Sequence, residues 1–414
     1  MPNFPKLTFF SALFAAALTV HAGTDEKLLA AARAAEPAVI SSLREMVAIE
    51  SGTMDAAGLL RMTDYAEARL VALGLQVERR KTGGSTGDLL LAQAQGSGRR
   101  KLMLIAHMDT VYAPGTLASQ PIKLEGNRLY GPGIADDKSG IAVVLHALAI
   151  LRDAGWKDYA RLTVLFNGDE ESQSAGSGEL IATLAAEHDV VLSYEPAPAK
   201  SMAKEEGVLL SAAGIATATI KVKGRSAHSG AAPELGRNAL VEAAHQILQT
   251  ENIAKDIPGA QLNWTVIQSG KVRNQIPDQA SVIADVRLNA ADAAPRLLAA
   301  LQAQAAKQHV ADTEVTVSLD IGRPPYVGGA RTEALAKRAQ AIYAELDGRK
   351  LMLHSGTGAG TDAGFANRSG KPAVLESLGL AGWGYHARDE YIELDSIVPR
   401  LYLSTRLLME LARD

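Results

Sequence analysis

The feature that most constrains this 414-residue chain is a short apolar run, residues 102–106, that stops at a histidine. The run has the length and composition of a fully buried strand. His107 follows it directly, and Asp109 lies two residues further on. Core packing gives no reason to end a buried strand with an imidazole and a carboxylate, so we interpret this end as part of a functional site.

Two later strands have the same design. Residues 162–166 form an apolar run followed within a few residues by Glu170 and Glu171, and residues 190–194 form another that Glu195 follows at once. Segments with helical spacing of apolar residues alternate with these strands, which is typical of a layered α/β sheet. The carboxyl ends of the strands share one edge of such a sheet, where ligands bind. We therefore expect these side chains to meet in one cleft.

The pattern of the chain changes near residue 213. Residues 213–323 read as β-α-β-β-α-β, with period-two strands and two amphipathic helices, which is the ferredoxin-like arrangement and is complete in itself. Residues 324–414 return to the style of residues 23–212. The sequence therefore predicts a mixed-sheet α/β/α domain, built from these two parts and interrupted by an inserted α+β domain.

Residues 1–22 have the pattern of a signal peptide. Lys6 supplies a positive charge, residues 7–20 are apolar but too few to span a bilayer, and a small-x-small site precedes Gly23. We expect cleavage after Ala22 and a periplasmic or secreted protein. The alternative is an uncleaved anchor or a buried N-terminal helix.

The composition limits the chemistry that the chain can carry out. There are no cysteines, so disulfides and thiolate sites are excluded and any metal site must use histidine and carboxylate ligands. The formal net charge is −4, which indicates no surface for nucleic acid or, once the signal is removed, for a membrane. Export without cysteines fits the bacterial periplasm, where folding would not rely on disulfides.

Histidines and carboxylates in this pattern suit zinc or a similar divalent ion. Two such ions close together need a bridging carboxylate, because an unscreened pair would repel. We assign the bridge to Asp136, which lies in a loop rich in glycine and proline. One ion would take His107 and Glu195, and the other Glu171 and His386. Co²⁺ or Mn²⁺ could substitute for the two zinc ions.

The remaining acidic residues of these clusters have other expected roles. Glu170 and Glu171 are adjacent, and adjacent side chains in extended chain diverge, so one binds metal while its neighbour acts as general base on the attacking water. Asp109 would accept the ring N–H of His107 and hold its tautomer. Each cluster alone has a plainer interpretation as solvated surface charge. Their joint occurrence at strand ends favours a site.

The other histidines carry no such pattern. We expect His146, on an apolar helix, to be a core residue, and His188, His245 and His309 to lie on helix surfaces. His354 stands near a glycine-rich loop, where a role as a metal ligand or beside one stays open.

With these residues in place, the chain resembles the dinuclear-zinc exopeptidase superfamily of aminoacylases, peptidase T and succinyl-diaminopimelate desuccinylase, and most of all the bacterial glutamate carboxypeptidases. The likeness covers nearly the whole chain from residue 28 onward. It is carried by ordered motifs, which are HMDTV from His107, YGPGIADDK from Tyr130, DEE from Asp169, SYEP from Ser193, AHSGAAPELG from Ala227, GTDA from Gly360 and GYH from Gly384.

The resemblance implies that the α/β/α domain is a zinc-exopeptidase catalytic domain, and it supports the metal roles assigned above. It implies Glu170 as the general base, Asp109 as the residue that orients His107, and a cis peptide bond after Asp136. It also implies a homodimer formed through the inserted domain.

The resemblance adds roles outside these clusters. His228 would enter the active site of the partner subunit and stabilise the tetrahedral oxyanion. Asn274, Arg287 and Arg323 would bind the substrate carboxylate, for which the planar fork of arginine is suited, and Gly360 would lie in the same substrate-binding region. The plainer alternative for His228 and the two arginines is a surface or interdomain salt bridge.

One segment departs from the family pattern. Glutamate carboxypeptidases carry a lysine after the second glutamate ligand that helps hold the substrate side chain. Here residues 197–213 are longer, Lys200 and Lys204 lie in uncertain register, and Leu209 and Leu210 bring apolar side chains to the region. This departure leaves the expected chemistry intact and opens the question of which side chain the enzyme prefers.

The expected function is that of a secreted dinuclear-zinc carboxypeptidase. It would hydrolyse the C-terminal amide bond of a small peptide or N-acyl amino acid and release glutamate from folate-type substrates. The first alternative is an aminoacylase or dipeptidase that prefers apolar side chains. The second is a binding protein on an inactive scaffold, and the complete set of ligands and base argues against it.

Overall fold

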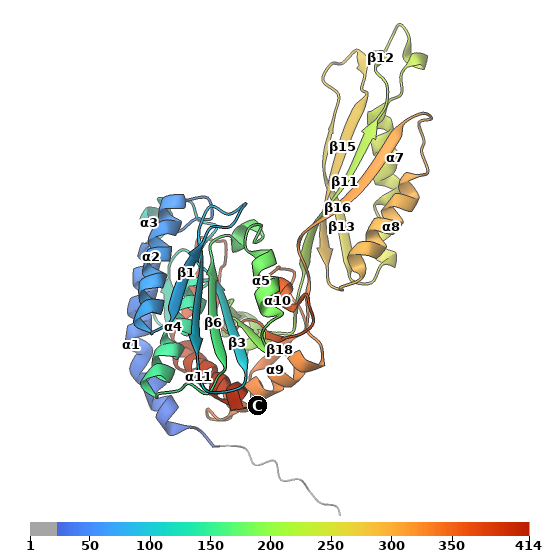
Figure 1. The fold of residues 1–414 in the computed structure, drawn as a ribbon. Helices are drawn as coiled ribbons and strands as arrows, with labels where there is room; N and C mark the ends of the chain where they lie inside the picture. Colours follow the sequence, from blue (N-terminus) through green and yellow to red (C-terminus); the bar gives the residue numbers. More distant parts are fainter. Residues whose placement is uncertain (1–22, 414) are drawn as a thin grey trace, which may run out of the picture.

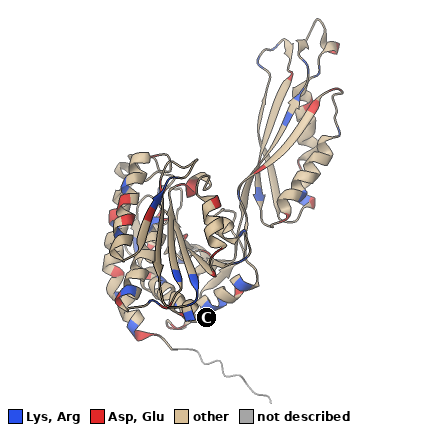
Figure 2. Cartoon of the chain, in the orientation of Figure 1, with Lys and Arg blue, Asp and Glu red and all other residues tan. Residues whose placement is uncertain are grey.

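The computed structural model describes residues 23–413. The expected signal peptide and its cleavage site lie outside these residues. The described chain forms a broad α/β body and a narrower, elongated body that extends away from it (Figure 1). No helix among the described residues combines the length and hydrophobicity that a membrane span requires. Basic and acidic residues are interspersed along the elements of both bodies (Figure 2).

The broad body is organised around a six-stranded mixed sheet. In spatial order its strands are β1 (Gln76–Arg80), β2 (Leu89–Gln95), β6 (Arg161–Asn167), β3 (Lys101–His107), β7 (Val190–Ser193) and β19 (Ala373–Leu375). The last four run parallel to one another, whereas β1 and β2 are antiparallel to their neighbours. The carboxyl ends of β6, β3 and β7 therefore lie side by side at one edge.

Helices cover both faces of this sheet because its central strands are apolar on both sides. Leu102 and Leu104 of β3 belong to one core, and Met103 and Ile105 belong to a second core on the opposite face. The first core is completed by α1 (Glu26–Ala48), α2 (Ala56–Ala72), α4 (Lys138–Asp153), α9 (Ala330–Ala344) and α11 (Ile397–Arg413). The second is completed by α5 (Gly178–Ala185) and α10 (Ala363–Asn367). The predicted α/β/α layering is confirmed.

A second sheet of five short strands lies in the same body. Its order is β4 (Lys123–Glu125), β5 (Arg128–Tyr130), β21 (Tyr391–Glu393), β20 (Ala381–Trp383) and β8 (Ala197–Pro198). The parallel pair β20 and β8 brings the chain after residue 381 beside the chain after residue 195. Two segments that are far apart in sequence thus converge on the edge where β7 ends.

The elongated body is a four-stranded antiparallel sheet with two helices on one face (Figure 1). Along the chain its elements are β11 (Gly214–Lys223), α7 (Ala239–Thr250), β13 (Ala260–Ser269), β15 (Gln279–Leu288), α8 (Ala293–Ala305) and β16 (Glu314–Arg323). The spatial order β13-β15-β11-β16 is the ferredoxin-like one. Strands β11 and β16 are neighbours, with Ile215 opposite Arg323, so the chain leaves and re-enters the broad body at one joint.

Short elements complete the described chain. They are α3 (Thr116–Ser119), α6 (Lys200–Ala203), β9 (Gly207–Leu209), β10 (Ser211–Ala212), β12 (Ala227–His228), β14 (Gln275–Ile276), β17 (Tyr326–Val327) and β18 (Met352–His354), together with single 3-10 turns η1 (Glu170–Ser172), η2 (Pro233–Leu235), η3 (Ile253–Asp256) and η4 (Leu394–Ser396).

Two histidines outside the candidate site are buried. His146 is a core residue as expected, with Nε2 2.9 Å from Ser42 Oγ. The expectation that His188 lies on a helix surface is wrong. His188 follows α5 and is only 4% exposed, and its ring contacts Leu184 O at 2.7 Å and Thr163 Oγ1 at 2.9 Å. Both ring nitrogens are used, so burial leaves no polar atom without a partner.

Candidate active site

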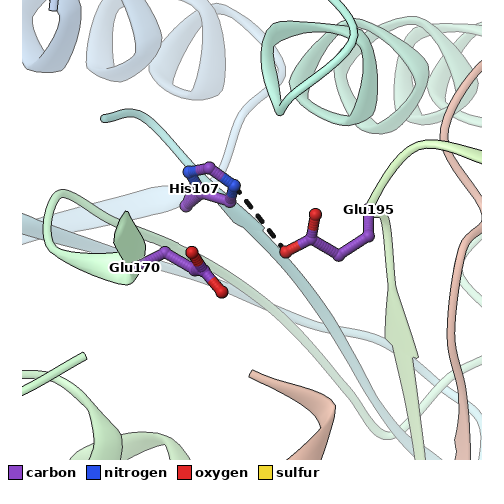
Figure 3. A group of neighbouring side chains, drawn as sticks. All are labelled: His107, Glu170 and Glu195. Atoms are coloured by element: carbon purple, nitrogen blue, oxygen red, sulfur yellow. Dashed lines mark ion pairs between the residues drawn. The ribbon is translucent and has the colours of Figure 1, made fainter. Parts of the chain in front are cut away.

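The structure brings the six predicted metal-ligand and general-base residues together at the carboxyl edge of the central sheet. His107 is the last residue of β3, Glu170 and Glu171 follow β6, and Glu195 follows β7. The other two members come from loops, Asp136 before α4 and His386 after β20. Figure 3 shows Glu170 and Glu195 pointing toward one another beside the ring of His107.

Asp136 lies between the two histidines. His107 Nε2 is 2.9 Å from Asp136 Oδ1, and His386 Nε2 is 3.3 Å from Asp136 Oδ2. His107 Nε2 is also 3.7 Å from Glu195 Oε1, and His386 Nε2 is 3.3 Å from Glu171 Oε2. The carboxylate of Asp136 thus contacts His107 through one oxygen and His386 through the other. The peptide bond that follows Asp136 is cis, as expected.

Asp109 holds several parts of the cluster. Its side chain is fully buried, and His107 Nδ1 lies 3.3 Å from its Oδ1 and 3.0 Å from its backbone carbonyl. Its two carboxylate oxygens also accept the backbone N–H groups of Glu170 at 3.1 Å and of Glu171 at 3.0 Å. Because Nδ1 faces only acceptors, it carries a proton, and Nε2 is the ring nitrogen that faces Asp136 and Glu195.

Arg323 lies in the cluster in an arrangement that the sequence did not predict. It is 4% exposed, and its Nη1 lies 2.5 Å from Glu170 Oε1 and 2.9 Å from the carbonyl oxygen of Gly360. Its Nη2 donates to the backbone carbonyl of Glu170. Its Nε is buried without a partner. Gly360 and Arg323 were both expected to bind substrate. In this structure Gly360 contacts Arg323, and Arg323 in turn contacts Glu170.

The structure does not bring two other predicted residues to the cluster of this chain. His228 is on β12, and Asn274 precedes β14, at the far tip of the elongated body (Figure 1). The two lie together, because Ser229 N donates to the carbonyl oxygen of Asn274 at 3.0 Å. Arg287, on β15, lines the same cavity as the cluster, with its Nε 3.0 Å from Asp285 Oδ2.

One residue of the site was missed by sequence reasoning. Glu390 is 2% exposed and uses both carboxylate oxygens to hold the loop that carries Asp136. Oε1 accepts the N–H groups of Ala135 at 2.8 Å and Asp136 at 3.0 Å, and Oε2 accepts that of Gly133 at 2.9 Å. The hydroxyl of Tyr112 donates to Oε2 at 2.6 Å. The only sequence signal is that Glu390 lies four residues after His386.

Burial governs the electrostatics of the three glutamates of the cluster. It raises the pKa of Glu170 to about 8, although Arg323 and His107 oppose the rise. Burial also raises the pKa of Glu171 and of Glu195. Carboxyl groups crowded together away from water disfavour the ionised form, and added positive charge reverses that preference.

The donor set fits a pair of divalent cations. Two groups of three residues could each hold a cation, because within each group one ligand atom per residue lies within 4.8 Å of the others. One group is His107, Glu170 and Glu195, and the other is His107, Asp136 and Glu171. Glu171 Oε1 is buried without a hydrogen-bond partner, which is what a carboxylate oxygen aimed at a cation would show. Imidazole and carboxylate together suit zinc, manganese or cobalt.

The cluster opens into a cavity of about 830 Å³ at the joint between the two bodies. Its polar lining is formed by members of the cluster and by Arg323, Arg287 and Asp285, together with Gln173, His354, Thr357, Thr361 and Ser377. The segment that contains α6 and β9 and the chain around β20 form another part of the lining. A cavity of this size accepts a small peptide or acyl amino acid.

Comparison with known proteins identifies relatives of this chain. The model of "Peptidase family M20/M25/M40" matches residues 103–410. The chain is 42% identical over 400 residues to carboxypeptidase G2 of Pseudomonas sp. (strain RS-16). This alignment covers 96% of this chain and 95% of that protein. It is 29% identical over 394 residues to succinyl-diaminopimelate desuccinylase of Stenotrophomonas maltophilia (strain R551-3), covering 90% and 100% of the two chains.

Solved structures share the fold. The M20 family metallo-carboxypeptidase Sso-CP2 from Sulfolobus solfataricus superposes with a TM-score of 0.69 at 16% identity, over 90% of this chain and 99% of that one. Aminopeptidase PepT from Bacillus cereus superposes with a TM-score of 0.68 at 20% identity, over 91% and 99%. The family is metal-dependent. This chain belongs to peptidase family M20/M25/M40.

Proposed function

We propose that the chain is a metallo-carboxypeptidase that hydrolyses the C-terminal amide bond of a small peptide or N-acyl amino acid. The observation that carries the proposal is the position of Glu170. This buried carboxylate lies beside the two-histidine cluster and in contact with Arg323, a cation suited to a substrate carboxylate. A base, a set of metal ligands and a carboxylate-binding cation in one cavity are the parts that this reaction needs.

We assign two zinc ions to the cluster. His107 and Glu195 would hold one, Glu171 and His386 the other, and Asp136 would bridge them. When bound, the pair would lower the pKa of the attacking water and polarise the substrate carbonyl. Asp109 supports this assignment, since it fixes the ring of His107 and the backbone of both glutamates in the loop after β6.

Glu170 would be the general base and then the general acid. Its carboxylate takes a proton from the attacking water, and the same oxygen returns the proton to the nitrogen of the leaving amine. Arg323 would bind the free α-carboxylate of the substrate. The contact of Arg323 Nη1 with Glu170 Oε1 must then be exchanged for a contact with the substrate, which frees the carboxylate of Glu170 for proton transfer.

The inserted body would complete the site from a second copy of the chain. His228 would stabilise the oxyanion in the partner's active site, with Asn274 beside it on the substrate. The remote position of both residues, together at the tip, supports delivery to another subunit over use within the same one. We accordingly propose a homodimer formed through residues 213–323, with residues 23–212 and 324–414 as the catalytic domain. We also propose export to the periplasm or beyond, which the signal-peptide pattern of residues 1–22 supports.

Two kinds of released amino acid are consistent with this chemistry. Resemblance to the glutamate carboxypeptidases favours glutamate, released from folate-type substrates. The second candidate is an amino acid with an apolar side chain, which the apolar members of the lining, Met202, Leu209 and Trp383, favour.

A substrate panel tests the proposed reaction. Zinc-loaded mature protein would be assayed with N-benzoyl and folyl amino acids, with and without a chelator, and with the C-terminal amides of the same compounds. We expect hydrolysis of the free acids, sensitive to chelator, and little hydrolysis of the amides. Hydrolysis of none of the free acids would contradict the proposed function, and hydrolysis that persists in chelator would contradict the metal assignment.

A further inference from the structure

We infer that the amino acid released by this chain carries an apolar side chain, and that Met202 and Leu209 determine the preference. The inference rests on the proposed function and concerns the same cavity. It specifies the substrate class, aliphatic or aromatic C-terminal residues, against the glutamate that resemblance favours.

The first observation is the chemistry of one wall of the cavity. Met202 and Ala203 come from α6, and Leu209 comes from the end of β9. Trp383, at the end of β20, and Tyr385 also line the cavity, and the hydroxyl of Tyr385 is turned to the carbonyl oxygen of Gly382 at 2.8 Å. This wall therefore presents methylene, methyl and ring carbon, which favour contact with an apolar group.

The second observation is the position of Lys200 and Lys204, the two lysines in the segment that contains α6. Lys200 Nζ lies 2.8 Å from Asp395 Oδ2 and 3.6 Å from Glu206 Oε1. Glu206 is itself buried and lies 2.9 Å from Arg400 Nε, so this acidic partner is anchored. Lys204 is exposed and is not among the residues that line the cavity. Among the described residues, the cavity lining contains no lysine.

The third observation is that the two arginines of the lining already face carboxylates. Arg323 lies against Glu170 and Arg287 against Asp285. The α-carboxylate of the substrate needs one of them. A second carboxylate, on a glutamate side chain, would meet Met202 and Leu209 where the described lining offers no lysine and no arginine that lacks a carboxylate partner, and an unpaired buried charge is costly. Among the described residues, His354 is the other basic residue of the lining outside the cluster. An apolar side chain meets no such cost in the same place.

Leu209 is held in place by its surroundings, whereas Met202 is exposed. Leu209 is 9% exposed, its N–H donates to the carbonyl oxygen of Glu376 at 3.1 Å, and β9 pairs with β18 opposite His354. Met202 is 53% exposed, so its side chain is replaceable without disturbing a core. A variant at Leu209 therefore changes a buried contact, whereas a variant at Met202 changes an exposed side chain and leaves the core intact.

The experiment compares kcat/KM for N-benzoyl-leucine, N-benzoyl-phenylalanine and N-benzoyl-glutamate in zinc-loaded protein. We expect the apolar substrates to be preferred at least tenfold over the glutamate one. Met202→Lys, and Leu209→Lys where it folds, should raise the glutamate-to-leucine ratio at least tenfold. The control is Met54→Lys, which introduces the same change at an 80% exposed position outside the cavity and should leave the ratio as in the wild type.

A binding measurement separates this inference from the proposed function. Calorimetry with the Glu170→Gln variant would compare the same three compounds without turnover, and we expect tighter binding of the apolar two. Preference for glutamate in hydrolysis or in binding, or an unchanged ratio in Met202→Lys, would overturn the inference while the proposed reaction stands. Absence of all hydrolysis would contradict the proposed function, and the binding order would still decide the inference.

Discussion

Arg323 and Glu170 form an ion pair, with Arg323 Nη1 2.5 Å from Glu170 Oε1, although 153 residues separate them. Arg323 is the last residue of β16, at the joint through which the elongated body is attached, and Glu170 directly follows the central sheet. The pair therefore couples the candidate base to the joint between the two bodies. In the proposed reaction the substrate carboxylate competes with Glu170 for the same guanidinium.

Replacement of the base should separate chemistry from folding. Glu170→Gln keeps the shape of the side chain and removes its ability to carry a proton. We expect kcat to fall by about 10²–10⁴-fold, with thermal stability and zinc content close to wild type. Steady-state kinetics, thermal denaturation and metal analysis of the same preparation would check this. A variant with wild-type kcat would exclude Glu170 as the base.

Arg323→Lys should weaken substrate binding more than it slows turnover. Lysine keeps the charge but cannot reproduce the planar fork that contacts Glu170 and Gly360. We expect KM for substrates with a free C-terminal carboxylate to rise at least about tenfold, with a smaller change in kcat. Arg368→Lys, at an exposed arginine that pairs with Glu179, is the matched control. Equal KM in wild type and Arg323→Lys would assign the guanidinium to structure alone.

Glu390→Gln should reduce metal affinity without touching a metal ligand. The two oxygens of Glu390 accept three backbone N–H groups and the Tyr112 hydroxyl, and an amide nitrogen at one position would face donors instead. The loop that carries Asp136 would lose part of its support. We expect zinc affinity to fall by about 10–100-fold in competition with a chelator.

The control for that variant lies three residues away. Glu393 is also buried, and its Oε2 accepts the N–H of Lys200 at 3.1 Å, outside the Asp136 loop. Glu393→Gln should bind zinc as the wild type does. A common loss of affinity in both variants would point to a general loss of structure, and no loss in Glu390→Gln would refute the positioning role.

Two buried histidines should make the protein less stable in acid. Burial lowers the pKa of His146 and of His188 to about 4, and nearby Arg69 and Arg161 act in the same direction. In the unfolded chain each would protonate near pH 6.5, so the unfolded state binds more protons between about pH 6.5 and 4. The stability that the neutral rings contribute is therefore complete above pH 6.5 and lost as the pH falls to 4.

Variants without these rings measure the effect. From pH 7 to pH 4.5, His146→Gln and His188→Gln should lose less unfolding free energy than the wild type, by up to about 3 kcal/mol each. Urea denaturation across this pH range would give the difference directly. His309→Gln, at an exposed position, serves as control. Parallel pH profiles for all four proteins would rule out the buried histidines as the cause of acid sensitivity.

Much of the fold could be predicted because its signals are local. Apolar runs such as residues 102–106 mark buried strands, and the alternation after residue 213 marks a different kind of sheet. The meeting of His107, Glu170 and Glu195 was expected from a topological rule alone, since parallel strands end at one edge. These features depend on periodicity and chain order, which the sequence by itself determines.

The tertiary structure alone decided which side chains contact one another across long separations. Glu390 supports a loop more than 250 residues earlier, Arg323 lies against Glu170 rather than free for a substrate, and His188 is buried under contacts with Thr163. Lys200 is another example, because its ammonium group pairs with Asp395 and Lys200 does not line the cavity. Such contacts depend on how distant segments pack and on which rotamers that packing allows, and no local pattern of residues encodes either.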